Sequence, residues 1–181
     1  MKQYRFKAVI LMCIIALMIP SFSFGLEKGT YSVKNETSYA NPKTGKAEDG
    51  GTQIALGDSM SRSMLGEYFL MDIKSKKQKY VTIRVGLQKY VSDIKVYVKN
   101  SKGEYKEVKI KEKAHNKKND TRDYKFAVSS DYPQLKIKAY VEPMERDVIF
   151  FAKALEKEVK KGKDTFEKTK LSTKISTPAG K

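Results

Sequence analysis

Apolar and polar side chains alternate with a period of two through most of the chain between residues 26 and 154. The alternation comes in short runs separated by turns rich in Gly, Asn, Asp or Lys, which is typical of an antiparallel β-sandwich. The pattern predicts eight strands, at Thr30–Val33, Gly66–Ile73, Lys79–Gln88, Ser92–Val98, Tyr105–Lys111, Asp123–Val128, Gln134–Val141 and Asp147–Ala152. Eight short strands in one domain predict an all-β, immunoglobulin-like antiparallel sandwich over residues 26–154.

Two segments depart from this alternation. Residues 35–59 form a long loop rich in Gly, Asn, Pro and Asp, and it leads into one short α- or 3₁₀-helical turn over Met60–Leu65, capped by Asp58 or Ser59. Residues 155–181 are rich in Lys and poor in large apolar side chains. We expect a frayed helix there to about Lys163 and then a disordered basic tail.

The first 25 residues have the parts of a secretory signal peptide. Residues 1–7 contain three basic side chains, residues 8–19 are apolar, Pro20 breaks the run, and Ser23 and Gly25 place small residues where signal peptidase cleaves. An uncleaved membrane anchor is the alternative, although the apolar run is short for a span. The mature protein is therefore expected outside the cytoplasm, secreted or at the cell surface, with no C-terminal anchor in this chain.

The chain carries 37 Lys and Arg against 21 Asp and Glu, a net charge of +16. Such a charge would ordinarily favour nucleic acid as a partner, but an exported protein does not meet it. Removal of residues 1–25 takes away three basic and no acidic side chains, which leaves a net charge of +13 on 156 residues. We therefore expect no nucleic-acid partner, and electrostatic contact with the anionic cell envelope instead.

Few residues of the mature chain suit conventional catalysis. Cys13, the sole cysteine, lies in the signal peptide, and His115, the sole histidine, lies in a polar basic turn. A thiol nucleophile, a zinc site built on Cys or His, and a Ser-His-Asp arrangement are therefore excluded. The protein is expected to be a binding module and not an enzyme.

Methionines stand where a sandwich does not need core residues. Met60 and Met64 are four residues apart, so a helical turn would place them on one face. Met144 follows Pro143 at the tip between the last two predicted strands. Each could be an adaptable core filler, but a thioether is also a soft, neutral ligand suited to haem iron or Cu(I).

Two segments carry a resemblance to a known family. The string from Tyr39 to Thr52, YANPKTGKAEDGGT, and the string from Ala55 to Ser63, ALGDSMSRS, resemble the opening of the Shp-type streptococcal cell-surface haem-binding domain. The string EPMERDVIFF from Glu142 resembles its final hairpin. The resemblance covers about residues 29–154. It implies a NEAT-related sandwich that holds haem (iron protoporphyrin IX) between the short helix and this hairpin, with two methionine ligands, and these fall on Met60 and Met144.

The same region is similar to a NEAT domain in a second register. There, the Ser63-Met64 pair corresponds to the opening of the lip helix and places Met64 as a distal haem contact. NEAT domains usually ligate iron through a Tyr-x-x-x-Tyr strand, whereas this chain has Glu142 and Arg146 at the counterparts. The choice of helix ligand between Met60 and Met64 stays open from the sequence, and the longer Shp-like motif favours Met60.

Other residues near the two motifs suit a porphyrin. Arg62, Ser63 and Arg146 flank the candidate ligands and could meet the two propionates. Tyr68 and Phe150 could form aromatic walls, since alternation allows only one of each neighbouring aromatic pair to face the pocket.

The resulting hypothesis is a secreted or cell-surface protein that captures haem and passes it to another carrier in bacterial haem-iron uptake. Its partners would be haem-donor and haem-acceptor proteins, with haemoglobin, a cell-surface haem receptor and a transporter-associated binding protein as the candidates. The alternative is a basic immunoglobulin-like adhesion or cell-wall-binding domain without a cofactor, which explains the charge but not the methionine positions.

Overall fold

A computed structural model describes residues 25–169 and residue 171. Residues 1–24 of the predicted signal peptide and residues 172–181 of the predicted tail lie outside it. The described chain contains nine strands: β1 (Gly29–Ser38), β2 (Tyr68–Ser75), β3 (Gln78–Val85), β4 (Val91–Lys99), β5 (Tyr105–Glu107), β6 (Lys111–Asn116), β7 (Thr121–Val128), β8 (Gln134–Val141) and β9 (Arg146–Lys161). Its helices are α2 (Ile54–Met64), the 3₁₀ turn η1 (Glu142–Met144) and α3 (Asp164–Lys168). Among the described residues, no helix has the length and apolarity to cross a membrane.

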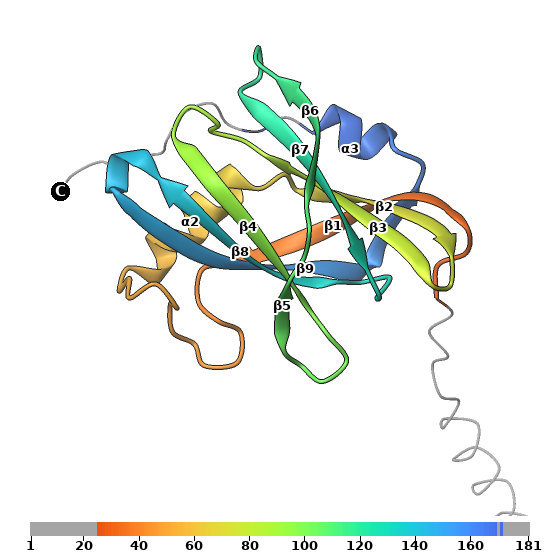
Figure 1. Cartoon of the computed structure of the whole chain (residues 1–181), viewed down its shortest axis with the longest axis horizontal. Coiled ribbons are helices and arrows are strands. Elements are labelled where there is room, and N and C mark those ends of the chain that lie inside the picture. The colour runs from red at the N-terminus through yellow and green to blue at the C-terminus, as the bar shows by residue number, and fades with distance from the viewer. Residues whose placement is uncertain (1–24, 170, 172–181) are drawn as a thin grey trace, which may run out of the picture.

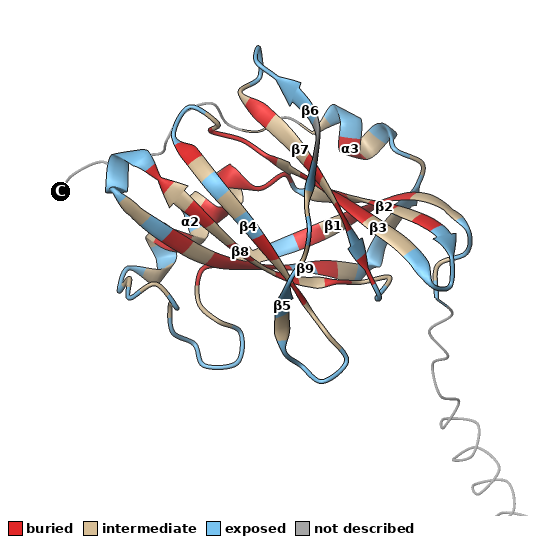
Figure 2. Cartoon of the chain, in the orientation of Figure 1, coloured by how far each residue is buried: buried red, intermediate tan, exposed pale blue. Residues whose placement is uncertain are grey.

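The nine strands form one antiparallel sheet in the order β5-β4-β8-β9-β1-β2-β3-β7-β6. Strand β9 pairs with β8 over residues 146–153 and with β1 over residues 151–161, so it links the two halves of the sheet. The halves lie across each other (Figure 1), and both contain buried residues (Figure 2). The buried side chains of the two halves form one core, among them Phe69, Met71, Ile83, Val96, Ile137 and Phe150. The predicted all-β antiparallel fold is confirmed.

All eight predicted strands are present, but the run 105–111 is divided. Residues 105–107 form β5, which pairs with β4, whereas residues 111–116 form β6, which pairs with β7. These two strands are the opposite edges of the sheet, so the chain between them crosses from one half to the other. His115 lies in β6, so its predicted place in a turn is wrong.

The helix is longer than the sequence pattern predicts. Helix α2 has 11 residues and begins at Ile54, after Gln53, whose side chain makes no capping hydrogen bond. The predicted cap at Asp58 or Ser59 is wrong, because both lie inside the helix. The Asp58 carboxylate instead accepts a hydrogen bond from the backbone N–H of Tyr39 at 2.6 Å, which ties the helix to the end of β1.

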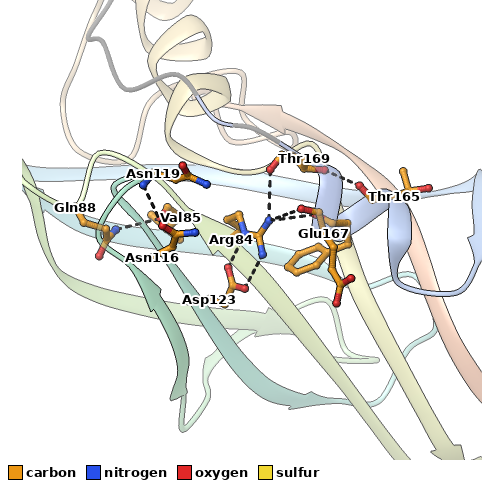
Figure 3. Close-up of polar contacts among 10 residues, drawn as sticks. Arg84, Val85, Gln88, Asn116, Asn119, Asp123, Thr165, Glu167 and Thr169 are labelled. Carbon is orange, nitrogen blue, oxygen red and sulfur yellow. Dashed lines mark hydrogen bonds and ion pairs between the residues drawn. The ribbon is translucent and has the colours of Figure 1, made fainter.

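The sheet does not end at Ala154, and the helix predicted up to Lys163 is wrong. Strand β9 continues to Lys161 and is followed by α3, whose Phe166 is 3% exposed. The Arg84 guanidinium lies 4.6 Å from the centre of the Phe166 ring and donates hydrogen bonds to carbonyl oxygens of residues 166, 167 and 169. Asp123 fixes this guanidinium through two hydrogen bonds of 2.7 and 2.8 Å (Figure 3). The first part of the predicted tail therefore belongs to the folded domain: β9 pairs with β1 up to Lys161, and α3 packs on β1 and β2 with Arg84 of β3 against it.

Candidate functional site

A cavity of about 370 Å³ opens between helix α2, the loop that precedes it and the start of β9. Met60 and Met144, the two candidate iron ligands, both line it, although they are 84 positions apart in the chain. The lining residues are Tyr39, Gly50, Gly51, Thr52, Gln53, Leu56, Gly57, Met60, Met144, Arg146 and Val148. The fold thus brings together the two segments that carry the family resemblance.

Met60 reaches the cavity from the middle of α2. The helix buries Gly57, Ser61 and Met64 against the sheet, and Met60 is half-buried at the edge of that face. A residue on this edge can touch both the protein and a ligand in the cavity.

Met144 reaches the cavity from the β8–β9 hairpin. It ends the 3₁₀ turn η1, and its side chain is 37% exposed. The next residue, Glu145, adopts a left-handed conformation with φ 50°, and its N–H donates to the carbonyl of Glu142 at 3.1 Å. This tight turn closes the hairpin, where Val141 pairs with Arg146, and leaves the methionine projecting at the tip. The predicted place of Met144 between the last two strands is correct.

The other helix methionine belongs to the core. Met64 is 2% exposed and is part of the main hydrophobic cluster. With Met60 and Ser63 it borders a small apolar hollow beside the cavity, together with Leu87, Tyr90, Val91 and Val141. Met64 therefore does not line the main cavity.

Four further candidates lie away from the main cavity. Arg62 donates to the side-chain and backbone oxygens of Asn35 on β1 at 3.4 and 3.3 Å, and burial lowers its pKa. The hydroxyl of Ser63 donates to the carbonyl of Ser59 within the helix. Tyr68 and Phe150 also differ from the expectation, because Tyr68 lies on β2 beneath Lys160 and Phe150 is fully buried in the core. Their neighbours in the sheet, and not the cavity, take up these side chains.

Arg146 does line the cavity, but the protein already holds its guanidinium. It donates to the hydroxyl of Tyr39 at 3.2 Å and to the backbone carbonyl of Asp49 at 3.4 Å. The Tyr39 hydroxyl in turn donates to the Asp49 carboxylate at 2.5 Å. Burial alone would raise the pKa of Asp49, but its hydrogen bonds and the nearby guanidinium hold that pKa below its usual value.

Tyr39 and Asp49 were not predicted from the sequence as site residues. Both stand in the YANPKTGKAEDGGT string, so the resemblance was the signal that could have found them. Burial and the hydrogen bond to Asp49 raise the pKa of Tyr39. The phenol of this tyrosine is thus kept protonated and occupied within the protein, which disfavours it as an iron ligand.

The donor atoms of the cavity suit a soft metal centre. Among the described residues, no group of three or more His, Cys, Asp or Glu side chains could hold a metal ion. The cavity offers two thioethers from two separate elements, within largely small or apolar walls. Haem iron accepts thioether ligands, and a porphyrin needs such walls, so the residues present fit this group. The fold and the cavity together define a β-sandwich with a methionine-lined ligand site.

Comparison with known proteins agrees with this class. A family model described as "Cell surface heme-binding protein Shp" matches residues 27–171. The chain belongs to this family, and its ligand is haem. No curated protein matches the chain.

Solved structures include two distant likenesses. The NEAT5 domain of IsdX2, a B. anthracis hemophore in complex with heme, is 12% identical, with a TM-score of 0.47 over 75% of this chain and 98% of that one. A mutant of the same domain, also in complex with heme, is 13% identical, with the same TM-score and coverage.

Proposed function

We propose that the chain captures haem at the cell surface through axial ligation by Met60 and Met144 and passes it to another carrier in iron acquisition. One observation carries this proposal: the two methionines line a single cavity, one from helix α2 and one from the β8–β9 hairpin. The proposal includes Met60 and not Met64 as the helix ligand, because Met64 is buried in the core.

The pair of ligands points to binding and transfer and not to catalysis. When haem is bound, thioethers on both axial positions leave no open site for oxygen or peroxide chemistry and raise the reduction potential of the iron relative to His or Tyr ligation. A thioether is neutral and a weak ligand, so each methionine can also leave. The exposure of Met144 at the hairpin tip gives a second protein access to one of the two ligands.

Substitution by leucine tests the ligand assignment without opening a cavity. Leucine keeps the volume and apolarity of methionine but has no sulfur. We expect Met60→Leu and Met144→Leu each to change the absorption spectrum of the haem complex and to speed haem loss to apomyoglobin. Met64→Leu, one helical turn from Met60, is the matched control and should keep the parent spectrum. The ferric and ferrous spectra of all four proteins give the comparison.

Three outcomes would contradict the proposal. A parent protein that gains no defined Soret band at equimolar haemin would end the haem assignment itself. A changed spectrum for Met64→Leu with a parent spectrum for Met60→Leu would move the ligand by one helical turn. Haem that is not lost to apomyoglobin over hours would contradict a role in transfer.

A further inference from the structure

A buried carboxylate joins the two walls of the cavity. The side chain of Asp49, in the loop between β1 and α2, is 3% exposed. Its Oδ1 accepts from the Tyr39 hydroxyl at 2.5 Å and from the N–H of Gly51 at 3.0 Å. Its Oδ2 accepts from the N–H of Ile149 on β9 at 3.0 Å and lies 3.8 Å from the Arg146 guanidinium. Both oxygens thus face hydrogen-bond donors, and those on Oδ2 belong to the strand that follows Met144.

Tyr39 extends this contact to the helix that carries Met60. Its ring lies against Gly57 of α2 and its hydroxyl against Gly51, and a Cβ atom at either glycine would overlap the tyrosine. Its backbone N–H also donates to Asp58 of α2 at 2.6 Å. The absence of a side chain at Gly57 lets the helix approach the ring this closely, three residues before Met60.

We propose that Asp49 is a positioning residue that, through Tyr39 on one side and the start of β9 on the other, fixes the Met60 helix relative to the Met144 hairpin. This inference rests on the proposed function, since it assigns the carboxylate to the placement of the two ligands. Asp49 itself does not line the cavity, so it acts through the residues it holds and not by touching the ligand.

An amide cannot replace this carboxylate. Asparagine has the same shape but offers one oxygen and one NH₂ group. Since donors face both oxygens of Asp49, either orientation of the amide would bring its NH₂ against a donor. The loop or the strand must then shift, and we expect the separation of the Met60 and Met144 sulfur atoms to change with it.

The test compares Asp49→Asn and Tyr39→Phe with Asp147→Asn in the full mature chain. Asp147 is the control because it is a 45% exposed carboxylate on β9, the strand that Asp49 contacts. Among the described contacts it pairs only with Lys138. We expect Asp49→Asn to speed haem dissociation by at least about tenfold, the factor that the loss of one charged hydrogen bond represents. Tyr39→Phe removes only the hydroxyl and should show the same direction to a smaller degree, while Asp147→Asn should match the parent.

Two further measurements separate positioning from a purely structural role. In haem-free protein, amide hydrogen exchange at Gly51 and Ile149 should become faster in Asp49→Asn but not in Asp147→Asn. In the haem complex, the absorption bands that report on iron coordination should shift in Asp49→Asn, at temperatures where the variant is fully folded. If Asp49→Asn unfolds outright, Tyr39→Phe decides by the same measurements. Parent-like spectra and dissociation rates in a folded variant would overturn this inference, whereas failure of the parent to bind haem would overturn the proposed function instead.

Discussion

Replacing Phe166 by alanine should destabilise the whole domain, although this residue stands in the charged C-terminal segment. Phe166 is 3% exposed, its N–H donates to the hydroxyl of Ser32 at 3.2 Å, and Arg84 stacks on its ring at 4.6 Å. Truncation of a buried phenylalanine costs about 3–5 kcal/mol, and the stacked guanidinium contributes about 0.5–2 kcal/mol more. Helix α3 packs on β1 and β2 at the surface of the domain and can partly relax, so the cost should lie in the lower part of this range. We expect Phe166→Ala to lower the free energy of unfolding by about 3–4 kcal/mol.

Chemical unfolding of the haem-free protein, followed by circular dichroism because the chain has no tryptophan, measures this loss. Glu167→Ala is the matched control, since Glu167 is exposed and its ion pair with Lys163 is a solvated contact between residues four apart. Such a solvated pair contributes little to stability, so Glu167→Ala should unfold at nearly the parent denaturant concentration. If Phe166→Ala and Glu167→Ala unfold at the same denaturant concentration, α3 does not belong to the folded domain and the reasoning fails.

Three other substitutions test separate parts of the structure. Met64→Ala should cost about 2–5 kcal/mol of unfolding free energy, because it empties a core position; a cost below about 1 kcal/mol would contradict its burial. Burial alone raises the pKa of Asp72, but hydrogen bonds from Lys125 and Thr30 bring that pKa below its usual value. The charge of Asp72 therefore stabilises the fold at neutral pH and ceases to do so as the pH falls through the depressed folded-state pKa, so the stability lost in Asp72→Asn should be large at neutral pH and shrink in acid; a pH-independent difference would refute this. Glu145→Gly should stabilise the haem-free protein by about 0.5–1 kcal/mol in thermal unfolding, since glycine adopts the left-handed conformation at that position without strain; a lower melting temperature would refute it.

The alternation of side chains predicted the strands well because one face of each is buried. In β8, for example, Leu135, Ile137 and Ala139 are buried and the residues between them are not. The same rule failed beyond Ala154. There β9 pairs with β1 but has passed the end of β8, which begins opposite Lys153. A strand at such an open edge carries many charged residues, so its sequence resembles that of a solvated tail.

The sequence could point to the two methionines that line the cavity, but not to the residues that hold the walls of the cavity together. Met60 and Met144 could be found because methionine is unusual at a helix edge and at a hairpin tip, and because both stand in long family-like motifs. Asp49 also stands in a family-like string, but its side chain gave no signal of its own, since a carboxylate in a loop rich in glycine is typical of a solvated turn. Its burial depends on Tyr39 and on the N–H of Ile149, which lies 100 positions away in the chain. The place of Arg62 could not be predicted for the same reason, because only the fold shows that Asn35 lies beside it.

Under the proposed function, the chain holds haem through two weak thioether ligands whose positions are fixed by the surrounding protein. Each thioether alone binds iron loosely, so retention of haem depends on how well the protein keeps both sulfur atoms in place, which is a matter of preorganisation. Met144 lies on an exposed turn, while the strand immediately after it is fixed by Asp49. A change at Asp49 or Tyr39, which hold these positions, should weaken mainly the bound state. Variants of Asp49 and Tyr39 should therefore differ from the parent in the rate of haem dissociation and hardly in the rate of association, which is the usual way in which changes at one interface act.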